Sequence, residues 1–230
     1  MQSNWKIFPV RLFLKFAMGI SLMNSNQYEL IVNFTNEQLA IIFQANASVV
    51  IGKMYSASDL SVAWQVFKPM RKNCLSWNEV YGIYASTSQL DVDCPIVQHS
   101  YTDLGASTRK LYTLKPDGSI SHPQDGGNAG VYALKNSYKE KKIITVGLYQ
   151  DASLNGDEVK GNPISASQVM LGHTVIMKPS HTINIWIQSH IKSSTVISNV
   201  SSPMTTLSFN AEKSEIVVTY NDDTGLFVAC

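Results

Sequence analysis

Two residues of the glycine-rich segment HPQDGGNAG, at 122–130, have side chains that could take part in chemistry. His122 and Asp125 offer an imidazole and a carboxylate, which together can bind a metal ion or exchange a proton. The other histidines are scattered, and none has the H-x-x-x-H spacing that places two imidazoles on one helix face. The segment also lacks the lysine and the glycine spacing of a phosphate-binding loop. We therefore interpret it as a polar turn and predict that alanine at His122 or Asp125 leaves function unchanged.

A second segment begins like a calcium-binding loop. Asp151, Ser153 and Asn155 supply oxygen side chains at positions one, three and five, and Gly156 follows at position six. The twelfth position, where a bidentate glutamate is needed, is Asn162, and no helical pattern flanks the segment. Asn-Gly is also a favoured turn dipeptide. The sequence therefore predicts a polar connection over 151–163 and no metal site.

The sequence contains no motif typical of nucleophilic catalysis. There is no G-x-S-x-G elbow, and the cysteines have no histidine signature near them. We expect a protein that is not an enzyme, with no catalytic residue and no cofactor, although a triad assembled from distant residues has no signature in sequence.

The three cysteines are Cys74, Cys94 and Cys230. An odd number leaves at least one thiol free or bonded to another chain. In an oxidising compartment, Cys74 and Cys94 are candidates for an internal disulfide, which leaves the terminal Cys230 for a second molecule. In the cytosol all three are expected to be thiols.

Three N-x-S/T sequons are candidate glycosylation sites, at Asn46, Asn199 and Asn33. A chain rich in Asn, Ser and Thr also produces such sequons by chance. Asn33 lies within an expected strand, which makes it the weakest of the three.

The charge balance limits the class of partner. The chain of 230 residues has a formal net charge of +1, and charged residues make up only 15% of it. No global field attracts nucleic acid, so we expect no nucleic-acid partner. A neutral surface of Ser, Thr and Asn instead meets little repulsion from a copy of itself or from a sugar.

Residues 1–27 differ from the rest of the chain. They are basic and apolar, which suits a signal, a short helix packed on the domain or at a lipid surface, or an extension upstream of a natural start at Met23. A lysine at position 15 interrupts the apolar stretch, and no small-x-small cleavage site precedes residue 24. These three alternatives remain open. The single folded domain is expected over 28–230.

From residue 28 onward the pattern is that of strands. The segments 61–67 and 75–83 carry two of the four tryptophans, alternate apolar and polar residues, and are joined by a short basic turn, which predicts a hairpin. Glu79 falls on the apolar face, so we expect a β-bulge there or a partly wet face. The other expected strands cover 28–35, 39–44, 48–55, 109–114, 131–136, 142–150, 169–177, 182–190, 194–200, 205–210, 215–220 and 226–229. A second hairpin is expected from 205–210 and 215–220, whereas 89–108 is expected to be mostly loop.

These strands predict an all-β fold: an antiparallel β-sandwich of two sheets, jelly-roll or Ig-like, with about ten strands. The expected core contains Trp64, Val66, Trp77, Ile83, Leu148, Ile185 and either Trp186 or Ile187.

Two functions follow as hypotheses. The first is a structural protein that self-associates into an ordered homo-oligomer through sandwich edges and Cys230. The alternative is a secreted binding protein, lectin-like or pore-forming, that acts on carbohydrate or a membrane surface; the alternating Ser/Thr-rich stretch 181–210 resembles the membrane hairpin of a β-pore toxin. A secreted or vesicular location is slightly favoured over a cytoplasmic one.

Overall fold

The structure is a computed structural model that describes residues 27–53, 61–91, 93–197, 200 and 202–230. The extension expected over 1–27 lies outside the described residues except for Gln27, which begins the first strand. Among the residues described, no helix has the length and apolar character needed to cross a membrane.

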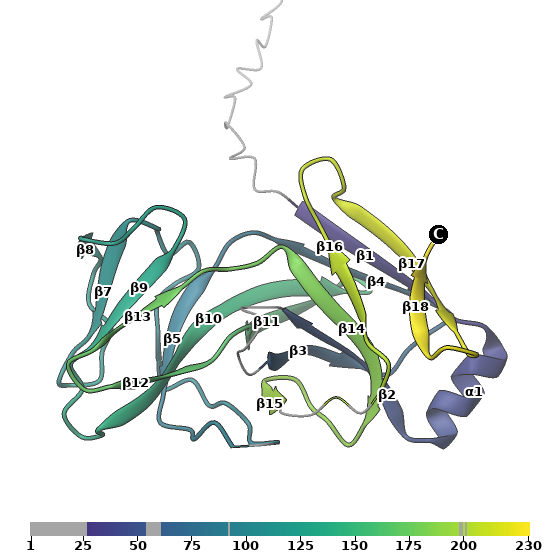
Figure 1. Cartoon of the computed structure of the whole chain (residues 1–230), viewed down its shortest axis with the longest axis horizontal. Helices are drawn as coiled ribbons and strands as arrows, with labels where there is room; N and C mark the ends of the chain where they lie inside the picture. Colours follow the sequence, from purple (N-terminus) through teal and green to yellow (C-terminus); the bar gives the residue numbers. More distant parts are fainter. Residues whose placement is uncertain (1–26, 54–60, 92, 198–199, 201) are drawn as a thin grey trace, which may run out of the picture.

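The all-β prediction is confirmed. Strands of three sheets pack together, with one short helix, as in a β-sandwich. The described residues contain eighteen strands instead of about ten, because an expected strand is divided into two and segments expected to be loops contain short strands of their own. The four-stranded sheet lies at one end of the molecule, and helix α1 (Asn36–Gln44) lies with β17 (Glu215–Asn221) and β18 (Leu226–Ala229) at the other (Figure 1).

The largest sheet has nine strands, and the long strand β10 (Ile143–Leu154) is its organising element. It pairs with four other strands, namely β4, β5, β11 and β12. The order is β18-β17-β1-β4-β10-β5-β6, with β11 and β12 also on β10. The bounds of these strands are β1 Gln27–Asn33, β4 Lys72–Asn78, β5 Gly82–Ser86, β6 Ser100–Tyr101, β11 Asp157–Pro163, β12 Ser167–Met170, β17 Glu215–Asn221 and β18 Leu226–Ala229.

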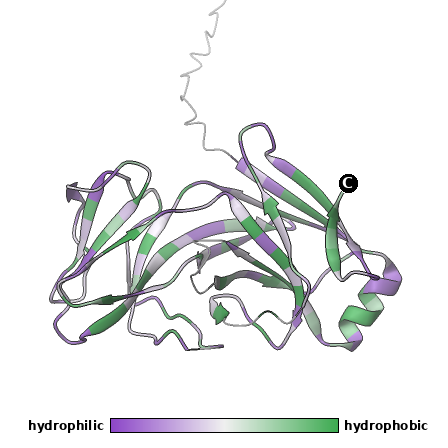
Figure 2. Cartoon of the chain, in the orientation of Figure 1, coloured by the Kyte–Doolittle hydropathy of each residue, from purple (hydrophilic) through white to green (hydrophobic). Residues whose placement is uncertain are grey.

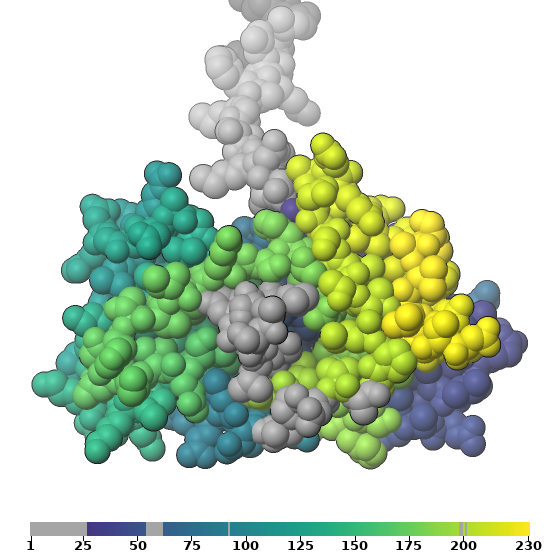
Figure 3. Space-filling model, in the orientation of Figure 1, coloured from purple at the N-terminus to yellow at the C-terminus, as the bar shows by residue number. Residues whose placement is uncertain are grey.

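The other two sheets are smaller. The five-stranded sheet has the order β15-β3-β2-β14-β16, with bounds β2 Ala47–Lys53, β3 Ser61–Phe67, β14 Thr182–Ser189, β15 Thr195–Ile197 and β16 Thr205–Ser208. The four-stranded sheet has the order β13-β9-β7-β8, with bounds β7 Lys110–Leu114, β8 Gln124–Asp125, β9 Tyr132–Asn136 and β13 Thr174–Met177. The C-terminal half of the chain, drawn green to yellow, covers much of the face shown in Figure 3.

The two predicted hairpins are wrong. Strand β3 belongs to the five-stranded sheet and β4 to the nine-stranded sheet, so the two do not pair. Their tryptophans meet across the core instead: the rings of Trp64 and Trp77 lie edge to face with centroids 5.4 Å apart. Likewise β16 pairs with β14, whereas β17 pairs with β1 and β18. In both cases the connection crosses between the layers instead of turning within one.

The strand expected over 39–44 is also wrong, because the chain forms α1 there. Thr35 caps the helix: its side chain accepts a hydrogen bond from the Gln38 N–H, and the Gln38 side chain accepts one from the Thr35 N–H. The Gln38 amide also donates to the Tyr220 carbonyl at 3.0 Å, which fixes the helix against β17. Figure 2 shows hydrophobic residues, in green, on the helix, and among them Ile41 and Phe43 are exposed.

Two further segments differ from expectation. The polar connection expected over 151–163 is the end of β10 and a hairpin with β11; Asn155 and Gly156 form its turn with φ values of 54° and 92°, as a type I′ turn requires. The strand expected over 169–177 is two strands, β12 and β13, in different sheets. The segment 89–108 is mostly loop, as expected, apart from the short β6.

The predicted core is largely confirmed. Trp64, Trp77, Ile83, Leu148 and Ile185 are buried in one cluster, and Ile187 packs against it. Trp186 is buried in a separate cluster, against which the half-buried Val66 packs. The nine- and five-stranded sheets are also joined by polar contacts: the Asn162 amide donates to the Trp64 carbonyl at 2.9 Å, and the Trp64 indole N–H lies 3.4 Å from the Gln150 carbonyl.

Candidate functional site

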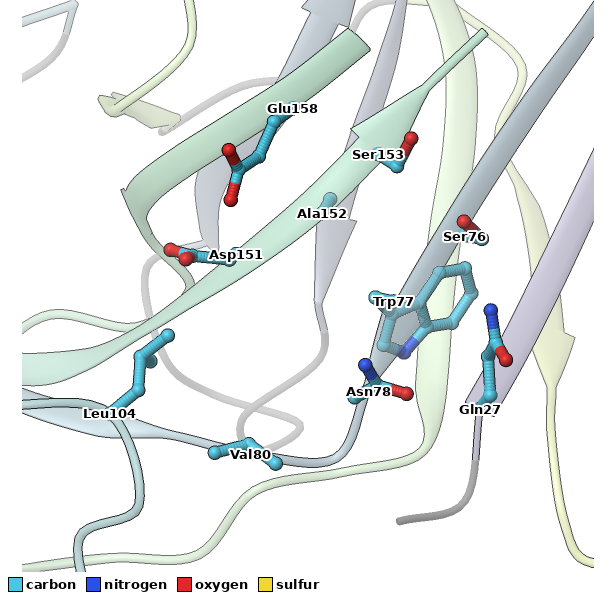
Figure 4. A pocket seen from close by; sticks show the side chains of 10 residues that line it. All are labelled: Gln27, Ser76, Trp77, Asn78, Val80, Leu104, Asp151, Ala152, Ser153 and Glu158. Carbon is cyan, nitrogen blue, oxygen red and sulfur yellow. The ribbon is translucent and has the colours of Figure 1, made fainter. Parts of the chain in front are cut away.

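A groove opens where β4 and β10 separate. The two strands pair only at Ser76–Ser153 and Leu75–Leu154, and β10 then continues along β5. The first lobe of the groove has a volume of about 430 Å³. Figure 4 shows its side chains, with Asp151 and Glu158 on one side and Trp77, Asn78 and Gln27 on the other.

A second lobe of about 420 Å³ continues from the first, since Leu104 and Asp151 line both. Its other lining residues are Gln98, Tyr101, Tyr149, Lys160 and Gly161. The Tyr101 ring is 63% exposed and lies edge-on to Tyr149, with ring centroids 6.2 Å apart. Asp151 is therefore at the junction of a polar lobe and an aromatic lobe.

A β-bulge positions Asp151. Gln150 pairs with Asn162 and Ala152 with Val159, so Lys160 and Gly161 together oppose Asp151. Gly161 has φ 71°, a value that glycine adopts without the cost paid by other residues. The bulge points the Gly161 N–H at Asp151 Oδ1, 2.6 Å away, and the Gln98 amide donates to the Gly161 carbonyl. Asp151 and Gln98 thus hold the backbone of Gly161 at its N–H and at its C=O.

The groove combines an aromatic ring with several polar groups. Its second lobe offers an exposed aromatic ring, a carboxylate, an amide and the Lys160 ammonium, which pairs with Glu158 at 3.1 Å. Burial raises the pKa of Tyr149 to about 12, with a smaller contribution from Asp151, so this phenol keeps its proton at neutral pH and donates to the Thr102 carbonyl.

A buried lysine lies in the core behind the groove. Lys53, at the end of β2, is 3% exposed, and its Nζ lies 4.9, 5.2 and 5.6 Å from the ring centroids of Trp64, Trp77 and Tyr81. Its carboxylate partner is Glu79, with Nζ and Oε1 3.4 Å apart. Burial lowers the pKa of Lys53 to about 8, and the opposing Coulomb attraction of Glu79 is the smaller effect.

At Glu79 the structure has neither the expected β-bulge nor the expected wet face. Strand β4 ends at Asn78, and the Glu79 side chain is only 10% exposed. Besides Lys53, its carboxylate accepts the Trp77 indole N–H at 3.1 Å and the Tyr81 hydroxyl, and it lies 3.1 Å from Nδ1 of His181. Burial, and then Glu79, raise the pKa of Tyr81. No sequence pattern reveals this cluster, because Lys53 and His181 are distant in sequence from Glu79, although an isolated glutamate on an apolar face was a signal for it.

The sequence-predicted candidates do not converge on one centre. His122 is exposed, and Asp125 is paired with Lys110 at 2.6 Å on the four-stranded sheet. Asp151 and Ser153 line the groove, but Asn155 points elsewhere and accepts the Cys74 N–H at 2.8 Å. Within the described ranges, no group of three metal-binding side chains comes together.

All three cysteines are free, so the expected Cys74–Cys94 disulfide is not formed. Cys74 lies on β4 opposite Ile31 in the nine-stranded sheet, whereas Cys94 lies in a loop, where its backbone carbonyl accepts the Val196 N–H of β15. Cys230 is exposed at the end of β18.

Two sequons fall on described residues. Asn46 is exposed in the turn after α1, where its Oδ1 accepts a hydrogen bond from the Lys68 ammonium, with Nζ 2.9 Å away. Asn33 is half-buried at the end of β1, between Lys72 and Thr219 of the neighbouring strands. Asn199 lies outside the described residues.

Comparison of the chain with protein families, with curated proteins and with solved structures finds no match.

Proposed function

We propose that this protein is a non-enzymatic, lectin-like binding protein whose two-lobed groove takes a carbohydrate. The observation that supports this most is Asp151 at the junction of the lobes. Its Oδ1 is held by the Gly161 N–H, and its Oδ2 has no hydrogen-bond partner among the residues described. A carboxylate oxygen held in place beside an exposed aromatic ring matches a sugar, which presents hydroxyl donors on its edge and C–H groups on its face.

The two lobes divide the recognition between them. Tyr101 supplies a flat apolar surface with only two side-chain torsions to order, which keeps the entropic cost of binding low. Gln98 and Asp151 are already ordered by their bonds to Gly161, so little further ordering is needed on binding.

The test is titration of the full chain with a panel of soluble oligosaccharides by calorimetry. Tyr101→Ala is expected to weaken binding roughly tenfold, the equivalent of about 1.4 kcal/mol. Asp151→Asn keeps an acceptor for the Gly161 N–H but loses the charged acceptor, and is expected to cost roughly 10- to 100-fold.

Two variants outside the groove serve as controls. Ile41→Ala removes a comparably exposed apolar side chain from α1, and Asp125→Asn removes an exposed carboxylate from β8; neither should change the affinity. The proposal fails if no oligosaccharide binds, or if the groove variants bind as well as the controls.

Self-association remains the second candidate, favoured by the exposed free thiol of Cys230. This residue follows β18, the outermost strand of the nine-stranded sheet. The sheet edges themselves offer less support. The free side of β15 is covered by residues 93–96, and Thr205 bonds both the N–H and the C=O of Phe227 on β18. A homo-oligomer would therefore need side-chain contacts in addition to edge pairing.

The segment that would insert into a membrane under the pore-forming alternative begins within the sandwich. Strand β14, the first part of the stretch 181–210, lies between β2 and β16, with Ile183 and Ile185 buried. Insertion into a bilayer would require this strand to leave both neighbours.

A further inference from the structure

A separate pocket lies where the nine-stranded sheet meets the four-stranded sheet. Its volume is about 440 Å³, within the range of small-molecule sites. It is lined by the end of β5, the start of β6, the turn after β7, the turn after β9 and one residue of β10. It shares no lining residue with the carbohydrate groove.

The floor of this interlayer pocket is apolar and belongs to the main core. Ala85, Leu114 and Ile144 are each no more than 3% exposed and pack within the same hydrophobic cluster. The Tyr138 ring forms a wall beside Gly118, where a Cβ on the glycine would lie 3.4 Å from the ring. The pocket therefore has an apolar floor for the body of a ligand.

The rim carries a hydroxyl–imidazole pair. Oγ1 of Thr87 and Nε2 of His99 are 2.9 Å apart. Whichever group donates in that bond, the neutral pair keeps one further N–H or O–H to donate: the His99 Nδ1–H if Thr87 donates, and the Thr87 hydroxyl if His99 donates. The pair is therefore a donor toward a ligand in either tautomer.

The charges at the rim leave a cation in surplus. Asp117 is engaged within its own turn: Oδ1 accepts from the Ser119 N–H at 2.9 Å and from its hydroxyl at 2.7 Å, and Oδ2 lies 3.8 Å from Lys115. Lys141 has no hydrogen bond or ion pair with any residue that the structure describes. The remaining rim charge is thus positive, and it lines the same pocket as the donor pair of Thr87 and His99.

We infer that the interlayer pocket binds a small amphipathic carboxylic acid. Its carboxylate lies between Lys141 and the Thr87–His99 pair, and its apolar body lies on Ala85, Leu114 and Ile144. This inference is independent of carbohydrate binding in the groove, because the two sites have no residue in common.

The experiment titrates the full chain with sodium octanoate and, separately, with 1-octanol, which has the same apolar body and no charge. Binding is followed by NMR, with the His99 imidazole signals reporting occupancy of this pocket. We expect octanoate to shift the His99 signals and to bind roughly tenfold more tightly than octanol.

Lys141→Gln should weaken octanoate binding by about tenfold and leave octanol unchanged. Lys142→Gln is the matched control, since its exposed lysine is adjacent in sequence but does not line the pocket. Thr87→Leu fills the rim from an exposed position and should weaken both ligands. The inference is overturned if octanoate leaves the His99 signals unshifted, if octanol binds as tightly as octanoate, or if Lys141→Gln and Lys142→Gln behave alike.

Discussion

At the scale of single residues, Lys53 and Glu79 are the least ordinary feature of the core. A buried ion pair is a weak source of stability, because desolvation of both charges offsets their attraction. Here Glu79 has more polar partners than Lys53 has. Glu79 accepts from Trp77 and Tyr81 and contacts His181 in addition to Lys53, whereas Lys53 has one carboxylate and three aromatic faces.

This inequality predicts different costs for the two substitutions. Glu79→Gln leaves the buried ammonium without a counter-charge and should lower the free energy of unfolding by about 3–5 kcal/mol. Lys53→Met should cost less, because Glu79 keeps its other donors and the methionine fills the space. Urea unfolding of both variants measures the difference; an equal or reversed order would contradict this account of the cluster.

Lys53 also predicts how stability depends on pH. Its pKa is about 8 when folded and near 10.5 otherwise, so between these values the unfolded chain binds more protons and stability rises with pH. Tyrosines act in the opposite direction above pH 10. Burial raises the pKa of Tyr132 and of Tyr149 to about 12, so the folded chain keeps protons that the unfolded chain has lost.

We therefore expect the free energy of unfolding to rise from pH 8 toward pH 10 and to fall above it. Denaturant titrations at pH 7, 9 and 11 check the curve. In Lys53→Met the rise should flatten while the fall above pH 10 remains. A rise that persists in Lys53→Met would assign the effect to another group.

At the scale of elements, the hairpin of β10 and β11 connects the fold to the proposed function. Its turn, Asn155-Gly156, fixes the register, and its bulge at Gly161 directs Asp151 into the groove. A Cβ at either Gly156 or Gly161 would meet no atom within 4 Å, so alanine at these positions acts on the backbone alone.

Gly161→Ala should therefore cost about 1–2 kcal/mol of stability through its positive φ, and it should also weaken carbohydrate binding because the bulge relaxes. Gly156→Ala is the matched control: with φ 92° it should lose stability of a similar order and keep its affinity for sugar. Thermal unfolding and calorimetry on both variants separate the two effects. If both lose affinity equally, the bulge has no special role in binding.

At the scale of the whole molecule, the net charge and Cys230 bear on self-association. A net charge of +1 leaves little long-range repulsion between copies, and Cys230 can reach a neighbour without distortion of the core.

If Cys230 holds an assembly, light scattering at high protein concentration under oxidising conditions should show a homo-oligomer. Reductant or Cys230→Ser should then loosen it while each domain stays folded. Cys94→Ser is the control, since that thiol is half-buried beside β15. A monomer with a free Cys230 under these conditions would end the self-association hypothesis.

The sequence alone determined the class of the fold and most of its core. Period-two alternation is a local property, so the inward faces at Trp64, Trp77 and Ile185 follow from neighbouring residues. The helix at Asn36–Gln44 also had a local signal, the capping box of Thr35 and Gln38, which the strand interpretation overlooked.

Only the tertiary structure decided which strands pair and which side chains meet. The buried faces of β3 and β4 can be satisfied side by side in one sheet or opposite each other across two, and alternation does not distinguish these arrangements. The groove depends on the same non-local choice. Tyr101 and Asp151 line the same lobe because β6 and β10 both pair with β5, and these contacts between distant segments leave no periodic pattern in the chain.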